Sequence, residues 1–214
     1  GTPITRIVDF AAPTTTDDSV IVWSPSSVTV TLTPSDGTGS GVASTYYCIY
    51  DTGGVACNPL AGTNGLSAVV NCVAGSVCNK TVKYLSIDNL GNAEVAHDSK
   101  QILIDAQATS TTDDSPATAW INSDLIVNLT ASDGIGSGIS NTYYCTYDSS
   151  DTPCTSFVAG ASISVTCAVG NVCNKTVRYF SSDNVGNNET AHDTNQIWID
   201  KQTPTSSVSI ANAV

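Results

Sequence analysis

The chain has 214 residues, of which 7 are basic and 19 acidic, and its formal net charge at pH 7 is -12. Proteins that bind nucleic acids through phosphates need a surplus of lysine and arginine, so this balance excludes such a partner and argues against adhesion to anionic membranes. The sequence has no signal peptide and no apolar run near the roughly 18 residues of a membrane helix, so we expect a mature chain or a fragment without a membrane span.

An internal duplication organises the chain. Residues 78–98 return as residues 173–193, 95 positions later, with 15 of the 21 residues identical. That spacing is the length of a small all-β domain, so we predict two tandem repeats. Residues 6–9 resemble the ends of both repeats. We therefore predict four segments: a terminal strand resembling the end of a preceding repeat (1–11), repeat 1 (12–106), repeat 2 (107–201), and the start of a further repeat or a strand for a neighbouring subunit (202–214).

Short alternating runs fill each repeat. Val28, Val30 and Leu32 alternate with threonines, which places the aliphatic side chains on one face of a strand. A glycine-rich turn follows at residues 35–41, and an aromatic, β-branched run begins at Thr45. No window keeps a helical period over three turns. Such strands, separated by turn residues, predict an all-β fold of two tandem β-sandwich domains with almost no helix.

The eight cysteines come as four per repeat at matching positions. An even number without a CxxC pair favours disulfides over a zinc site. Four cysteines allow three connectivities, and locality favours bridges across turns: Cys48–Cys57, Cys72–Cys78, Cys145–Cys154 and Cys167–Cys173. We expect these bridges to pin hairpins and to leave the two sheets without a cross-link. Disulfides place the protein outside a reducing cytosol, so the predicted localisation is extracellular or cell-surface.

Four Asn-x-Ser/Thr sequons agree with that compartment and are candidate glycosylation sites: Asn79, Asn128, Asn174 and Asn188. Asn79 and Asn174 occupy the same position in the two repeats. Asn128 alternates with inward-facing aliphatic residues, so we expect it to point outward, where a glycan has room.

Recurring oxygen-bearing side chains are candidate calcium ligands, because calcium takes about six to eight oxygens from converging loops. The candidates are Asp17, Asp18, Asp88, Asn92, Glu94, Asp113, Asp114, Asp183, Asn187 and Glu189. Asp36 and Asp133 also recur, in the glycine-rich turns. The alternative is that these side chains form Asx turns at strand ends. No other cofactor is expected.

Two further residue types recur without indicating catalysis. His97 and His192 stand beside aspartates, but a catalytic dyad also needs a poised nucleophile and a pocket, so we expect exposed or turn-capping histidines and no enzyme. Trp23 and Trp120 precede the first long strand of each repeat. Packing against the core or a neighbouring module is the favoured interpretation, and exposed ligand stacking is the alternative.

A known family shares these motifs. The pattern Y-x-S-x-D-N-x-G-N-x-E, preceded by SDGxGSG and a T-Y-Y strand, resembles the bacterial and archaeal immunoglobulin-like repeats of surface proteins, including OmpL47-type and other Big-like tandem domains. The resemblance covers roughly residues 12–201 and implies immunoglobulin-like sandwiches strung in series, with no catalytic residues to carry over. This chain departs from it in having four cysteines per repeat.

We therefore expect a structural extracellular module, the repeat unit of a surface fibre, sheath or adhesin stalk. Such a protein self-associates, and strand exchange through residues 5–9 or 206–210 is one route. Two alternatives remain: an adhesin module that binds a glycan or protein receptor, and a non-catalytic spacer of a secreted enzyme.

Overall fold

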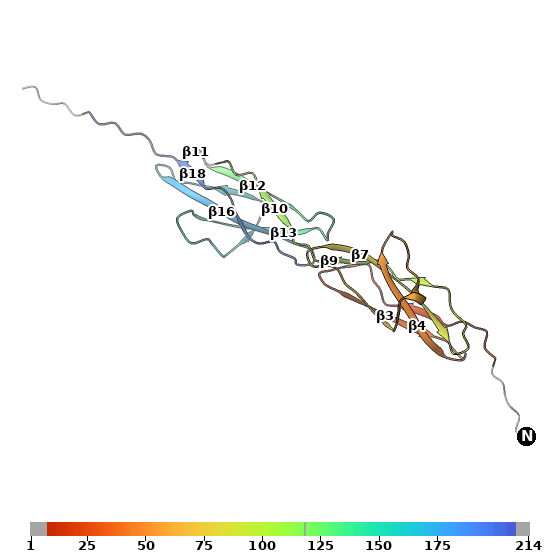
Figure 1. Cartoon of the computed structure of the whole chain (residues 1–214). Helices are drawn as coiled ribbons and strands as arrows, with labels where there is room; N and C mark the ends of the chain where they lie inside the picture. Colours follow the sequence, from red (N-terminus) through yellow and green to blue (C-terminus); the bar gives the residue numbers. More distant parts are fainter. Residues whose placement is uncertain (1–7, 118, 209–214) are drawn as a thin grey trace, which may run out of the picture. The chain divides into compact units, whose positions relative to one another are not determined.

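The computed structural model describes residues 8–117 and 119–208 (Figure 1). The chain divides into two compact units, with the main division between Gln107 and Ala108. Each unit is a two-layer β-sandwich, so the predicted all-β fold of two tandem sandwich domains is confirmed.

Unit 1 contains a three-stranded and a six-stranded sheet. The first has the order β1 (Thr14–Asp17), β3 (Val28–Ser35), β6 (Ser67–Val70). The second has the order β2 (Trp23–Ser24), β9 (Ile102–Asp105), β7 (Val77–Asp88), β4 (Val42–Asp51), β5 (Thr63–Asn64), and β8 (His97–Asp98) also pairs with β7. The β2–β9 pair is parallel and the other pairs are antiparallel. A short 3-10 helix, η1 (Pro59–Ala61), follows β4.

Unit 2 repeats this topology without the 3-10 helix in its described residues. Its first sheet has the order β10 (Ser110–Asp113), β12 (Leu125–Ser132), β15 (Ser162–Val165). Its second has the order β11 (Trp120–Ile121), β18 (Ile197–Asp200), β16 (Val172–Asp183), β13 (Ile139–Asp148), β14 (Val158–Ala159), with β17 (His192–Asp193) on β16.

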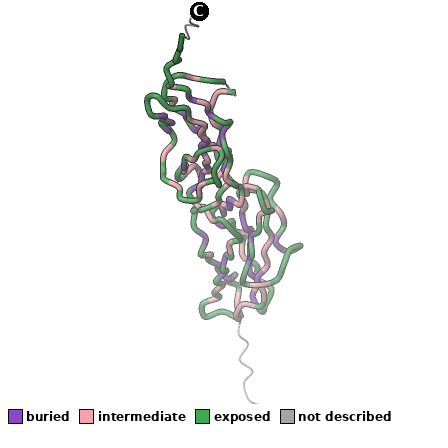
Figure 2. The backbone as a smooth tube through the Cα atoms, turned by 90° about the vertical axis from the view of Figure 1, so that its left-hand side faces the viewer, coloured by how far each residue is buried: buried purple, intermediate pink, exposed green. Residues whose placement is uncertain are grey.

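The core of unit 1 lies between its two sheets. Val30 and Leu32 of β3 are buried while the threonines between them are exposed, as the sequence alternation predicts. They pack with Val82 of β7 and with Ile102 and Ile104 of β9. Figure 2 shows buried positions interspersed with intermediate and exposed ones along the backbone. The hydrophobic effect on these aliphatic residues therefore holds the two layers together.

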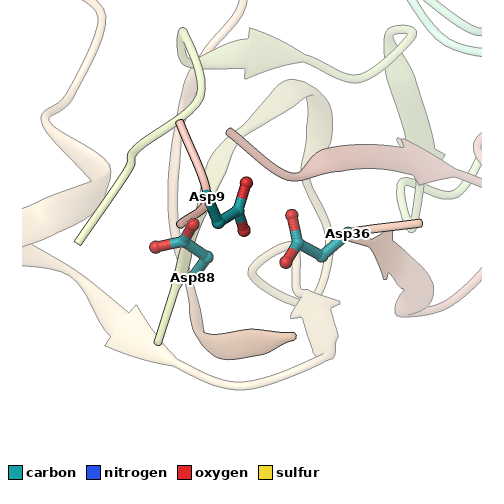
Figure 3. Close-up of side chains that lie close together, drawn as sticks. All are labelled: Asp9, Asp36 and Asp88. Carbon is teal, nitrogen blue, oxygen red and sulfur yellow. The ribbon is translucent and has the colours of Figure 1, made fainter. Parts of the chain in front are cut away.

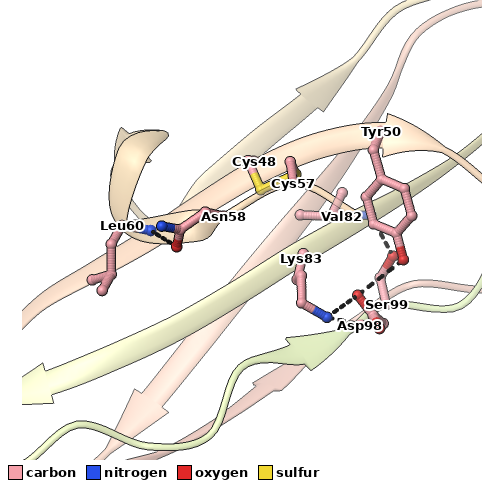
Figure 4. Close-up of a disulfide and its surroundings, with 9 residues drawn as sticks. All are labelled: Cys48, Tyr50, Cys57, Asn58, Leu60, Val82, Lys83, Asp98 and Ser99. Carbon is pink, nitrogen blue, oxygen red and sulfur yellow. Dashed lines mark hydrogen bonds and ion pairs between the residues drawn. A yellow bond between two sulfur atoms is a disulfide. The ribbon is translucent and has the colours of Figure 1, made fainter. Parts of the chain in front are cut away.

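All four disulfides have the predicted pairing. Cys48–Cys57 joins β4 to the segment before η1, where the Asn58 side chain accepts a hydrogen bond from Leu60 N (Figure 4). The expectation that the sheets carry no cross-link is wrong. Cys72 follows β6 of one sheet and Cys78 lies in β7 of the other, so this bridge closes the connection between the layers. Each bridge stabilises its unit by roughly 2–3 kcal/mol through chain entropy.

The predicted terminal strands fall largely outside the described residues. Residues 1–7 and 209–214 are not described, and residues 8–13 and 202–208 contain no strand. The described part of the chain forms no helix long and apolar enough to span a membrane.

Candidate functional site

Unit 1 contains two groups of acidic residues that differ in their hydrogen-bond partners. The first group, here called the sheet bridge, consists of Asp17, Tyr84 and Glu94 with the strand residues they bind. Tyr84 of β7 donates its hydroxyl to Asp17 Oδ2 of β1 at 2.7 Å, and Ser19 N donates to Asp17 Oδ1 at 2.9 Å. Burial alone would raise the pKa of the Asp17 carboxyl, but the hydrogen bonds from Ser19 and Tyr84 hold it below its usual range.

Glu94 completes the sheet bridge. Its side chain is only 4% exposed. Glu94 Oε2 accepts from Thr15 N of β1 at 2.9 Å, and Oε1 accepts from Ser86 N of β7 at 2.7 Å and from the Thr15 hydroxyl. Burial, followed by the bond to Asp17, raises the pKa of Tyr84, which therefore stays a neutral donor. These carboxylates thus hold the two sheets against each other.

Asp18 and the matching acids of unit 2 also accept hydrogen bonds from strand residues. Asp18 Oδ1 accepts from Thr31 N of β3 at 2.7 Å. In unit 2 the corresponding bonds are Tyr179 Oη to Asp113 at 2.7 Å, Thr111 N to Glu189 at 2.9 Å, and Asn128 N to Asp114 at 2.7 Å. Six of the ten predicted calcium ligands therefore accept hydrogen bonds from strand residues: Asp17, Asp18, Glu94, Asp113, Asp114 and Glu189.

The second group is the carboxylate cluster, defined as Asp9, Asp36 and Asp88. Each places a carboxylate oxygen within 4.8 Å of the others (Figure 3). Asp9 precedes β1, Asp36 follows β3, and Asp88 ends β7, so three separate segments of unit 1 converge. Asp88 is only 2% exposed.

Backbone amides of the surrounding turns orient the cluster. Ser40 N donates to Asp9 Oδ2, and Gly41 N donates to Asp36 Oδ2, both at 2.6 Å. Gly39 lies between these two carboxylates, because a Cβ there would lie 2.5 Å from both Asp36 Oδ2 and Asp9 Oδ2. A side chain at this position would therefore collide with the two acids.

Asn92 links Asp88 to Asp9. Its Nδ2 donates to Asp88 Oδ2 at 2.6 Å and to the Asp9 carbonyl at 3.1 Å, and its backbone N donates to Asp88 Oδ1 at 2.7 Å. Burial would raise the pKa of the Asp88 carboxyl, yet hydrogen bonds from Asn92, Leu90 and Ser40 hold it below its usual range. Asp88 is consequently ionised at neutral pH. Asn92, one of the predicted ligands, thus positions the cluster through its amide nitrogen.

One oxygen of the cluster lacks a hydrogen bond. Asp36 Oδ1 is buried and accepts no hydrogen bond from the described residues. The ion pairs of the described residues involve other acids, and none joins a lysine, arginine or histidine to Asp9, Asp36 or Asp88. An arrangement of hard oxygens without a cationic side chain has the chemistry of a divalent-cation site.

Sequence reasoning identified part of this cluster. Asp88 and Asn92 were predicted, and Asp36 was recognised as recurrent. Asp183 and Asn187 make the matching bond in unit 2, where Asn187 Nδ2 donates to Asp183 Oδ2 at 2.7 Å. Asp9 was missed, although the likeness of residues 6–9 to the repeat ends was a signal that its position is special.

The histidines lie on the surface of the second sheets. His97 Nε2 is 3.4 Å from Glu94 Oε2, and its ring stacks on Tyr84 with centroids 5.8 Å apart. His192 is 3.2 Å from Glu189 in unit 2. Both side chains are about half exposed, at 49% and 51%. These contacts extend the sheet bridge toward the solvent.

Trp120 is exposed instead of packing into the core of unit 2. Its side chain is 59% exposed, and it faces Trp198 of the neighbouring strand with ring centroids 4.9 Å apart. Trp120 borders an open hollow of about 510 Å³ that Asn122, Asp200 and Gln202 also line. In unit 1, Trp23 has Leu103 opposite it, so this aromatic pair belongs to unit 2 alone.

The sequons differ in accessibility. Asn79, Asn128 and Asn188 are exposed. Asn174 is half-buried, and its Nδ2 donates to Gln196 Oε1 at 3.3 Å. Oligosaccharide attachment therefore has more room at the first three positions.

The sequence of the chain matches no known family or curated protein. Among solved structures, the chain is similar to the Clostridium thermocellum CbhA fibronectin(III)-like modules, with a TM-score of 0.34 and 14% identity over 92% of this chain and 100% of that one.

Proposed function

We propose that this chain is a structural module of an extracellular fibre, sheath or adhesin stalk, in which sandwiches in series provide length and mechanical resistance. The observation that carries the proposal is the duplication of all bracing features: both units have the same sheet order, the same two bridges and the same acid-to-strand bonds. A binding site needs such bracing once, whereas a load-bearing series needs it in every unit.

Several properties support an extracellular location and a non-catalytic role. Disulfides persist in oxidising compartments, and the exposed sequons Asn79, Asn128 and Asn188 would carry glycans there. The histidines contact structural glutamates, which leaves them without the arrangement of a nucleophile and its base. We therefore infer a self-associating glycoprotein without enzymatic activity.

Surface labelling and electron microscopy test this proposal together. Antibodies against the purified chain should label intact source cells, and material released from them should form filaments with an axial spacing of one or two units. Labelling that appears only after cell lysis would overturn the extracellular assignment. Surface material that is always a monodisperse two-unit particle would favour a spacer of a larger secreted protein.

Carbohydrate binding is a second candidate function, favoured by the exposed Trp120, whose ring contacts the half-buried Trp198. An indole stacks on the apolar face of a hexose, while amide and carboxylate groups such as those of Asn122, Asp200 and Gln202 hydrogen-bond its hydroxyls.

A glycan array with the purified chain tests this candidate. Trp120→Ala should abolish binding of any glycan that the chain retains, whereas Trp23→Ala, the matched change in unit 1, should leave binding intact. Equal binding by all three proteins would exclude the tryptophan pair as the site.

A further inference from the structure

We propose that the carboxylate cluster, Asp9, Asp36 and Asp88, binds a calcium ion that fastens the segment before β1 to the body of unit 1. The inference rests on the proposed structural function and gives it a mechanism for stiffening one point in the chain.

Electrostatics supplies the first step. Three carboxylates approach within 4.8 Å in a partly buried setting, and no cationic side chain of the described residues forms an ion pair with them. Like charges at this distance repel more strongly near the protein interior than in water. The amides of Leu90 and Asn92 donate to Asp88 Oδ1 at 2.9 and 2.7 Å, but these neutral donors carry no positive charge to offset the repulsion among the three carboxylates. A bound cation would relieve it.

One buried oxygen supplies the second step. Asp36 Oδ1 is buried without a hydrogen-bond partner among the described residues. Buried polar atoms normally find partners, since leaving one unsatisfied costs about 1–3 kcal/mol. A metal ion accepts an electron pair from a carboxylate oxygen, so a cation bound here would give Asp36 Oδ1 the partner that it lacks.

The donor set identifies the ion. All candidate ligands are carboxylate oxygens, with no histidine or cysteine among them, which favours hard cations over zinc or copper. Calcium takes about six to eight oxygens in flexible geometry, whereas magnesium demands a near-ideal octahedron. Three carboxylates from separate segments, each giving one or two oxygens, suit calcium, with water completing the coordination.

The consequence concerns the segment that contains Asp9. Residues 8–13 form no strand, and within that segment the side chain and carbonyl of Asp9 already reach Ser40 N and Asn92 Nδ2. A calcium ion would add bonds from Asp9 to Asp36 beyond β3 and to Asp88 at the end of β7. Tension on the segment would then pass to both sheets of unit 1.

Calcium titration of the full chain tests the proposal. We expect calorimetry with CaCl2 alone to give a dissociation constant of about 10⁻⁴–10⁻³ M, as in other extracellular modules. Hydrogen exchange should slow at residues 37–41 and 89–92, which assigns the binding to this cluster. At 10 mM calcium, the unfolding midpoint of unit 1 should rise by about 5 °C or more.

Three variants give the test its controls. Asp36→Asn and Asp9→Asn should each weaken calcium binding at this site at least tenfold and remove the local exchange protection. Asp9 lies outside every strand, so its variant keeps the fold even if Asp36→Asn does not. Asp18→Asn, an exposed acid of the same unit, should bind as wild type.

Three outcomes would overturn the proposal. The first is wild-type protection at residues 37–41 that does not change with calcium. The second is equal protection by magnesium at the same concentration. The third is calcium binding by both Asp9→Asn and Asp36→Asn that equals that of Asp18→Asn. Surface labelling and filament formation are scored separately, so a failed calcium site is distinguished from a failed structural function.

Discussion

The sheet bridge and the carboxylate cluster are both built from acidic residues of one sandwich. Only in the sheet bridge does every carboxylate oxygen accept a hydrogen bond. In the sheet bridge, Asp17 and Glu94 accept hydrogen bonds from Tyr84, Thr15 and Ser86, so these carboxylates connect the two sheets. In the cluster, backbone amides satisfy some oxygens while Asp36 Oδ1 is left without a partner among the described residues. The difference shows that available donors, and not acidity, separate a structural carboxylate from a candidate ligand.

Breaking the sheet bridge at Glu94 should have the largest effect. Glu94→Gln puts an amide NH2 opposite backbone donors in a site whose side chain is 4% exposed, so unit 1 should lose about 3 kcal/mol of unfolding free energy. Urea denaturation with and without calcium measures this loss, which should be the same in both conditions. Glu189→Gln is the matched change and should destabilise unit 2 instead. A loss below about 1 kcal/mol would show that the bridge contributes little.

Removing one hydroxyl from the same bridge should have a smaller effect. Tyr84→Phe deletes the 2.7 Å bond to Asp17 and leaves the ring in the core, so we expect a loss of about 1.5 kcal/mol, the value typical of a hydrogen bond to a charged group. Thermal unfolding of this variant beside Tyr179→Phe measures it in both units. A variant as stable as wild type would indicate that water replaces the hydroxyl.

Acid titration sharpens the comparison further. The folded pKa of Asp17 lies below its usual value of 3.8, so the unfolded chain binds the proton first as pH falls. The stability that Asp17 contributes is therefore present above about pH 4 and lost progressively below it. Because Tyr84 is one cause of the lowered pKa, Tyr84→Phe should flatten the acid limb of the stability curve measured between pH 5 and 2. An unchanged slope would assign the limb to other carboxyls.

The smallest effect is expected from the cluster in the absence of metal. Asp36→Asn relieves repulsion while keeping an oxygen to accept from Gly41 N, so in EDTA its unfolding free energy should equal or exceed that of wild type by about 0.5 kcal/mol. In calcium the order should reverse. A variant that is less stable than wild type in EDTA would place Asp36 with the structural acids.

Local sequence patterns were sufficient to predict much of the fold. The 95-residue repeat, the alternation of Val28, Val30 and Leu32, and the short cysteine spacings predicted two disulfide-braced sandwiches. They succeed because strand period and turn closure depend on residues close in sequence. The same spacing did not reveal that Cys72–Cys78 links two sheets, because sheet membership depends on which distant strands pair.

Only the tertiary structure decided which acids meet. Asp9, Asp36 and Asp88 lie 27 and 52 residues apart in sequence and converge because the ends of separate strands come together in the sandwich. Asp17 and Glu94 are similar candidates in sequence, yet the packing of the two layers brings the Tyr84 hydroxyl to Asp17 and the Thr15 amide to Glu94. Burial and hydrogen-bond supply at each oxygen are properties of the packed fold, so a sequence can supply candidate ligands while the fold selects among them.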